Sequence, residues 1–194
     1  MLGTLGSLLP ALEELYLIDE PAAGPDGVQQ LAEKLGAGAL PAANYLVIMS
    51  THLGDAGASA LAAALGRGAL PRLKNLHLIG NAIGDAGLVA LAPALRRLPA
   101  LEALSLSGNP FGDEGLAALV APPPPAGAPP PTGVLTKLER LILSETQIND
   151  AGCAALASAL ESGALPALKT LSLNGIRASA TAKATVRRAG LVMM

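Results

Sequence analysis

Residues 70–87 read LPRLKNLHLIGNAIGDAG, and this stretch decides the fold because near-copies of it recur along the chain. The copies occupy residues 9–27 (LPALEELYLIDEPAAGPDG), 40–57 (LPAANYLVIMSTHLGDAG), 98–115 (LPALEALSLSGNPFGDEG) and 134–152 (VLTKLERLILSETQINDAG), and a sixth begins at residue 165 as LPALKTLSLNG. The first core positions are spaced by 31, 30, 28, 37 and 30 residues, from Leu12 through Ala43, Leu73, Leu101 and Leu138 to Leu168. A period of about 30 residues predicts a solenoid of stacked units.

Each copy contains a short alternation of residues, such as Leu76-His77-Leu78. A period of two indicates a strand whose leucines all face the same side. We therefore expect one inward pair per strand: Leu15/Leu17, Leu46/Ile48, Leu76/Leu78, Leu104/Leu106, Leu141/Leu143 and Leu171/Leu173.

A helix is expected after each strand, because apolar residues then recur at a spacing of four, as in Leu61/Leu65 and Leu91/Leu95. A Gly-Ala-Leu-Pro segment at residues 68–71 and 163–166 supplies the residues that end a helix. An aspartate stands where each helix should begin, and there a carboxylate accepts backbone N–H groups and faces the positive end of a helix. These aspartates are Asp26, Asp55, Asp85, Asp113 and Asp150.

Strands that alternate with helices predict right-handed crossovers and a parallel sheet. The repeated unit places the sheet inside and the helices outside, which is an α/β architecture. No single unit can bury its own apolar face, so the stability must come from stacking between neighbours.

The pattern L-x-x-L-x-L-x-x-N-x-I-G-D-x-G resembles the leucine-rich repeats of ribonuclease inhibitor, and similar repeats occur in the Ran GTPase-activating protein and in nucleotide-binding immune receptors. The resemblance implies a leucine-rich repeat solenoid, a right-handed β-α superhelix shaped like a horseshoe. We expect residues 1–194 to form one domain of five to six repeats, at residues 9–39, 40–69, 70–97, 98–133, 134–164 and 165–194.

The resemblance also implies that an asparagine in each loop satisfies buried backbone groups. Asparagine occupies this position only at Asn81 and Asn109. Threonine should replace part of its function at Thr51 and Thr146, whereas Glu20 and Ile176 cannot bond in the same way.

Two regions depart from the repeat. Residues 121–133 (APPPPAGAPPPTG) should truncate the fourth helix and form a polyproline II loop, either as a solvated insertion or as a ligand for a proline-binding module. Residues 1–9 resemble the end of a repeat helix, so the chain either belongs to a longer array or pairs, for instance with itself, through its open N-terminal edge. Residues 178–194 are expected to form a final helix.

Composition narrows the possible partners and compartments. The net charge is −2 and the charges are scattered, so we expect no nucleic-acid partner. Residues 35–54 carry no charge, but the repeat explains this run better than a membrane span does. The single cysteine, Cys153, excludes an internal disulfide and fits a cytoplasmic protein.

The chain offers no set of residues suited to catalysis, so we do not expect an enzyme or a cofactor. His77 and Ser105 should lie on adjacent strands, but no acidic residue stands in their row to orient the histidine. Two histidines and one cysteine are too few for a zinc site. Cys153, at a helix start, is expected to pack as a small apolar residue.

The outward strand positions are therefore the candidate functional surface. They form rows across the sheet, and apolar and aromatic side chains gather in the N-terminal half, where they either form a contact site or are simply tolerated on half-buried strands. We predict a protein-interaction scaffold that binds a protein partner on its concave face through Tyr16, Ile18, Tyr45, Val47, Met49, His77, Ile79, Arg140 and Ile142.

The alternative function is a GTPase-activating or regulatory domain similar to the Ran activator. That activity requires an exposed arginine in an N-terminal loop. The first two loops, residues 18–27 and 49–57, contain none.

Overall fold

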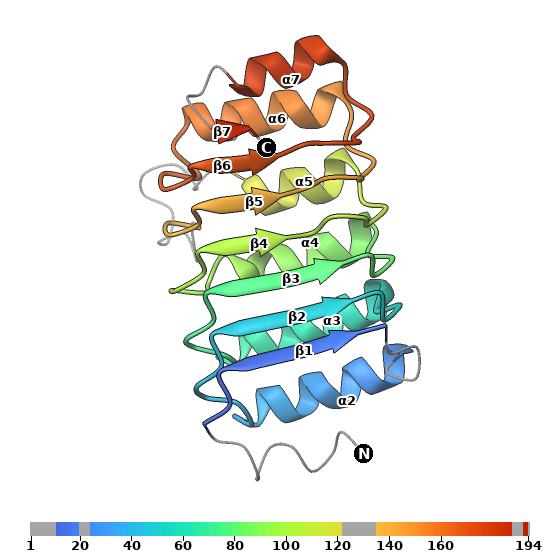
Figure 1. Ribbon diagram of the computed structural model, residues 1–194, viewed down its shortest axis with the longest axis vertical. Coiled ribbons are helices and arrows are strands. Elements are labelled where there is room, and N and C mark those ends of the chain that lie inside the picture. Colours follow the sequence, from blue (N-terminus) through green and yellow to red (C-terminus); the bar gives the residue numbers. More distant parts are fainter. Residues whose placement is uncertain (1–10, 20–23, 122–134, 188–191, 194) are drawn as a thin grey trace.

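The computed structural model describes residues 11–19, 24–121, 135–187 and 192–193. Within them, strands and helices alternate along the chain, and the strands form one parallel sheet in sequence order (Figure 1). The strands are β1 (Glu14–Ile18), β2 (Tyr45–Met49), β3 (Asn75–Ile79), β4 (Ala103–Ser105), β5 (Arg140–Ile142), β6 (Thr170–Ser172) and β7 (Val192–Met193). The helices are α2 (Gly24–Gly36), α3 (Gly54–Gly66), α4 (Asp85–Leu95), α5 (Asp113–Val120), α6 (Asp150–Glu161) and α7 (Ala180–Arg187).

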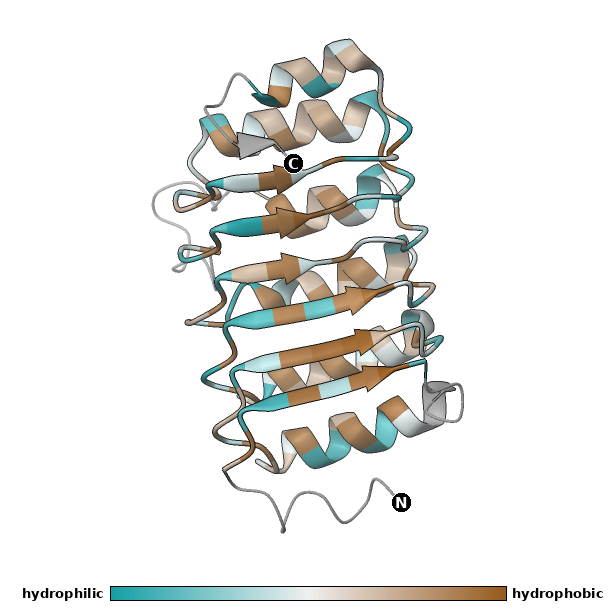
Figure 2. Ribbon diagram, in the orientation of Figure 1, coloured by the Kyte–Doolittle hydropathy of each residue, from teal (hydrophilic) through white to brown (hydrophobic). Residues whose placement is uncertain are grey.

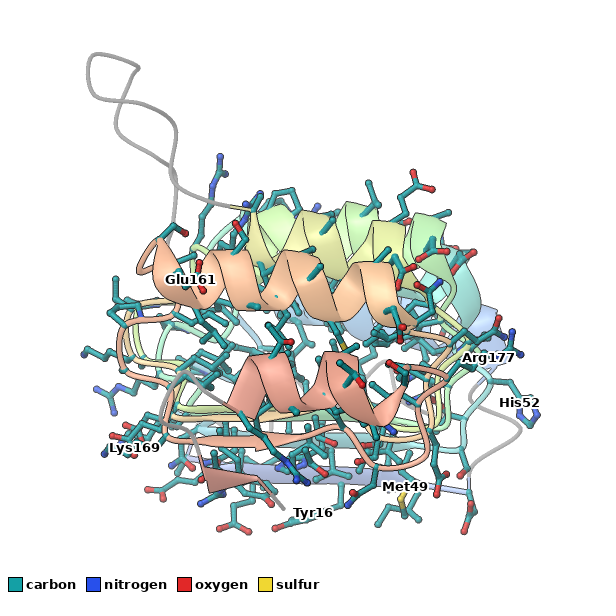
Figure 3. The ribbon with its side chains drawn as sticks, turned by 90° about the horizontal axis from the view of Figure 1, so that it is seen from above. Tyr16, Met49, His52, Glu161, Lys169 and Arg177 are labelled. Carbon is teal, nitrogen blue, oxygen red and sulfur yellow. The ribbon has the colours of Figure 1, made fainter. Side chains whose placement is uncertain are left out.

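The helices cover one face of the sheet and leave the opposite face open. Seen from above, the helix layer lies on one side, and the side chains of the open face project from the other (Figure 3). Each strand pairs in parallel with the next, and each described helix packs beside the helix of the following unit. The α/β solenoid expected from the repeat is therefore confirmed.

The strand leucines form the shared interior, as predicted. Leu46 aligns with Leu76, and Leu76 aligns with Leu104. The side chains of Leu76, Leu141 and Leu171 are completely buried. At the N-terminal end the core is thinner, because Leu15 and Leu17 on β1 are only partly buried.

The loop asparagines satisfy backbone groups, as the resemblance implied. The side-chain oxygen of Asn109 accepts the backbone N–H groups of Asn81 and Ile83, at 3.0 and 3.1 Å. Its amide nitrogen donates to the carbonyl oxygens of Leu78 and Leu106, at 2.6 and 2.8 Å. Asn81 bonds in the same way to the preceding repeat, including the backbone N–H of Thr51.

Of the two loop threonines, Thr146 follows the expectation, whereas the Thr51 hydroxyl donates to Oδ1 of Asn81 at 3.0 Å and not to a backbone group. The Thr146 hydroxyl donates to the Leu143 carbonyl at 2.9 Å, which is part of the function of asparagine. Ile176 is buried and apolar, and Glu20 lies outside the described residues.

The aspartates accept backbone N–H groups, as expected, but these groups belong to the next repeat rather than to the helix that the aspartate begins. The residues directly before α3, α4 and α5 form no side-chain cap bond of their own. Each described aspartate instead bonds to the residue just before the following helix: Asp55 to Gly84 (2.7 Å), Asp85 to Gly112 (2.8 Å), Asp113 to Asn149 (3.0 Å) and Asp150 to Ser179 (2.6 Å). The side chain of Asp26 lies outside the described part.

A left-handed residue follows the last outward position of every strand from β1 to β6. Glycine occupies this position after β3, β4 and β6, at Gly80, Gly108 and Gly175. Asp19, Ser50 and Glu145 adopt the same positive φ, of 52°, 53° and 58°. Because L-residues are strained in this region, these three positions carry a conformational cost.

The region before the proline-rich segment and the C-terminal region can be compared with the prediction. Helix α5 ends at Val120 after 8 residues, whereas α6 has 12, so the truncation is confirmed. Residues 1–10 and most of the proline-rich segment, from residue 122 onward, lie outside the described residues. The final helix exists, but it ends at Arg187, and a seventh strand at Val192–Met193 pairs with β6 where further helix was expected.

Candidate partner-binding site

The open face of the sheet carries the outward residues in aligned rows. The first row runs from Glu14 through Tyr45, Asn75 and Ala103 to Arg140 and Thr170. The second row runs from Tyr16 through Val47, His77 and Ser105 to Ile142 and Ser172. In the third row, Ile18, Met49 and Ile79 align across β1, β2 and β3.

Seven of the predicted residues come together on these first three strands. Figure 2 shows that hydrophobic residues dominate β2 and the ends of β1 and β3. We call this surface the N-terminal patch; it consists of Tyr16, Ile18, Tyr45, Val47, Met49, His77 and Ile79.

Three rings form a ladder across the patch. The Tyr16 and Tyr45 ring centroids are 5.5 Å apart with an interplanar angle of 30°, and those of Tyr45 and His77 are 5.3 Å apart at 27°. Tyr45 therefore has ring neighbours on two strands, and the stacking holds it in place before any partner arrives.

Exposure varies strongly within the patch. Tyr16 and Ile18 on β1 are 51% and 42% exposed, and they are two of three large apolar residues exposed to this degree in the described chain; Val89 on α4 is the third. Val47 is only 8% exposed, so it supports the surface and offers little contact area. Tyr45, Met49, His77 and Ile79 are partly buried.

Polar groups border the ladder. The Tyr16 hydroxyl donates to Oε2 of Glu14 at 2.8 Å, and this hydrogen bond is the main reason why the pKa of Tyr16 is raised. Partial burial lowers the pKa of His77, and the positive charge of Arg140 lowers it further. Near neutral pH, His77 is therefore a neutral ring that stacks on Tyr45.

Arg140 and Ile142, the two remaining predicted residues, lie on β5, apart from the patch. Strand β4 separates them from His77 with small side chains, Ala103 and Ser105, which are 4% and 2% exposed. Arg140 is exposed and Ile142 is partly buried. The predicted set is therefore one apolar cluster and a separate basic position, not a single continuous site.

Comparison with known proteins agrees with the fold. A leucine-rich repeat family model matches residues 44–62, 71–92, 98–120 and 134–157. The protein is a leucine-rich repeat solenoid. No curated protein matches the chain.

Two solved structures resemble this leucine-rich repeat solenoid. One is leiomodin-1 actin-binding site 2, at 14% identity and a TM-score of 0.53, covering 97% of this chain and 84% of the other. The other is TLR13 in complex with ssRNA13, at 19% identity and a TM-score of 0.43, covering 89% and 27%. The leiomodin likeness supports the fold alone, and the TLR13 likeness carries no argument.

Sequence reasoning missed the ion pairs of the repeat rim. Directly before β3 and β4, and again before β5 and β6, the neighbouring residues carry opposite charges. Lys74 therefore lies 3.4 Å from Glu102, and Lys169 bonds to Glu139 at 2.6 Å. The signal was present, because the register that aligns the leucines also aligns these neighbours. The pairs are exposed, and such pairs contribute little to stability.

The described part of the repeats holds no group of three or more His, Cys, Asp or Glu that could bind a metal ion. Burial raises the pKa of the Cys153 thiol, and the side chain is 1% exposed, which favours a packing role. His77 aligns with Ser105, but the Ser105 hydroxyl is buried and lies 3.5 Å from the Ser107 hydroxyl. Among the described helices, none is long and apolar enough to cross a bilayer.

Proposed function

We propose that this protein is an interaction scaffold that binds a protein partner through the open, concave face of its sheet. One observation carries the proposal: the sheet face that the helices leave uncovered bears the ring ladder and the exposed apolar side chains of β1. Exposed aromatic and aliphatic residues that cluster on one face are typical of contact sites.

The ladder suits binding because it is already ordered. A protein interface loses free energy when flexible side chains become fixed. The Tyr45 ring stacks on His77 and packs at a tilt against Tyr16 without a partner, so its loss of freedom on binding is small. The partly exposed row formed by Ile18, Met49 and Ile79 adds apolar area beside them.

We also propose the finer classification. A helix of 8 to 13 residues in each repeat and a spacing of 28 to 31 residues in most units support the ribonuclease-inhibitor type, with residues 1–194 forming one domain. Binding without catalysis is the proposed role, and the cytoplasm is the proposed compartment. The GTPase-activating alternative gains no support, because the first two loops lack an arginine.

The experiment is affinity capture from native lysate with the wild-type chain and two variants, Tyr45→Ala and Ile79→Glu. The matched control is Val89→Glu, which places the same charge on an exposed apolar residue of the helical face. We expect both patch variants to lose a partner that the wild type and Val89→Glu retain. If both patch variants keep every partner, the N-terminal patch is not the binding site.

A further inference from the structure

We propose that the open face recognises a polypeptide segment with a basic side chain at one end, apolar side chains in the middle and an acidic side chain at the other end. The basic end lies over β1 and the acidic end over β5. This inference rests on the proposed function, because it specifies the partner of the same surface.

The charge distribution of the open face supports this choice. The first two outward rows from β1 to β6, together with the third row from β1 to β3, contain two Asp, Glu, Lys or Arg residues, namely Glu14 and Arg140. Neither forms an ion pair within the described residues, whereas the rim residues Lys74 and Lys169 are each already paired with a glutamate. Complementarity therefore requires a positive group opposite Glu14 and a negative group opposite Arg140.

The β1 end fits a basic side chain, arginine above all. Oε2 of Glu14 accepts the Tyr16 hydroxyl, and no described group bonds to the other carboxylate oxygen. Tyr16 is half exposed and has one ring neighbour in the described structure, so one face of its ring is open to a cation. A planar guanidinium can stack on that ring and bond to the carboxylate at the same time.

The surroundings of β1 and β2 reinforce this preference. Residues 11–19 and 37–53 contain three acidic residues, Glu13, Glu14 and Asp19, and no lysine or arginine. The side chains of Glu14 and Asp19 are exposed. A basic side chain that approaches this end of the sheet is therefore attracted by these carboxylates, and neither segment carries a cation that would repel it.

The β5 end has the opposite sign. Arg140 is exposed, and its charge contributes to the lowered pKa of His77 two strands away, so its field reaches the middle of the face. Glu14 and Arg140 occupy the same row four strand steps apart, about 19 Å at the usual spacing of about 4.8 Å. An extended segment covers that span with about six residues.

The test is selection from a phage-displayed library of random peptides, panned on the full chain. We expect enriched peptides to carry a basic and an acidic residue separated by apolar residues. Binding of these peptides should weaken on the order of tenfold in Glu14→Lys and in Arg140→Glu, and both losses should shrink in high salt. Glu161→Lys, the same charge change on the exposed end of α6, should leave binding unchanged.

The outcomes separate the two proposals. Peptides whose binding requires Tyr45 but is unchanged by both charge reversals would contradict the proposed segment with one basic and one acidic end. They would still support binding at the N-terminal patch. Peptides that bind the wild type and Tyr45→Ala equally well, or a selection without enrichment, would contradict both. Because Glu14 and Arg140 are exposed, thermal melting should show that all variants remain folded.

Discussion

Oδ1 of Asp85 lies 2.7 Å from the backbone nitrogen of Gly115, in the third residue of the next repeat's helix. The first turn of a helix has N–H groups without partners inside the helix. The same oxygen accepts the N–H of Gly112 at 2.8 Å, so one carboxylate caps the helix that follows its own. A Cβ at position 115 would lie 2.9 Å from that oxygen of Asp85. This close approach explains why glycine occupies the position two residues after Asp113, the aspartate of the next repeat.

Replacing Asp85 with alanine should lower the free energy of unfolding by about 1–3 kcal/mol, because two N–H groups lose a charged acceptor. The measurement is equilibrium unfolding in urea. Glu114→Ala is the matched control, since Glu114 also lies in the first turn of α5 but is exposed and forms no side-chain hydrogen bond within the described part of the chain. Equal losses for the two variants would show that the inter-repeat bond contributes nothing.

The loop asparagine should contribute more to the free energy of unfolding than the threonine that occupies the same position in another repeat. Asn109→Ala should cost about 3–5 kcal/mol, because two N–H groups and several buried carbonyl groups lose their partner together. Thr146→Val removes a single hydrogen bond and should cost about 1–2 kcal/mol. Urea unfolding of both variants checks the order, and a smaller loss for Asn109→Ala would refute it.

Glu145→Gly should stabilise the protein. Glu145 is exposed and has a φ of 58°, where a side chain costs about 1–2 kcal/mol and glycine costs none. The greater freedom of glycine in the unfolded chain offsets part of this, leaving a gain of about 0.5–1 kcal/mol. Glu145→Ala keeps the Cβ and should give no gain, so a melting temperature that rises equally in both variants would contradict the explanation.

His77 should make stability depend on pH. Its pKa is lowered in the folded state, so the unfolded chain binds the proton more readily below the ordinary value of about 6.5. The contribution of His77 to the free energy of unfolding is therefore fully present above about pH 6.5, the ordinary value, and is lost as the pH falls through the pKa of the folded state. Between pH 7.5 and pH 5, the melting temperature of the wild type should therefore fall further than that of His77→Gln. Identical falls would exclude His77 as the cause.

Sequence alone predicted the strand register and the buried leucines. This succeeded because the alternation Leu76-His77-Leu78 recurs with almost constant spacing, and a shift of one residue would turn every leucine outward. The same register places Tyr45 and His77 on the open face of neighbouring strands, in adjacent rows, so most of the candidate site could be placed before the structure was known. The diagonal contact between the two rings is visible only in the structure.

Other features required three-dimensional information. The partner of Asp85 lies 27 and 30 residues away, at Gly112 and Gly115, so local spacing assigns the carboxylate to the wrong helix. Val47 faces outward by its register but is buried. It lies between Tyr16 and His77 on the neighbouring strands, and the sequence of its own strand does not reveal this burial. Strand β7, at Val192–Met193, lacks the leucine pattern of the others and was therefore not predicted.

The central claim is that the open face at β1 to β3 contacts a protein partner. The most direct test places the photoreactive residue p-benzoylphenylalanine at Tyr16 in one protein and at Val89 in another, then irradiates each in native lysate. Both positions are exposed, but Tyr16 lies on the open face and Val89 on the helical face. The account predicts a discrete adduct from position 16 that is absent from position 89. An adduct from position 89 alone, or the same adduct from both, would contradict it.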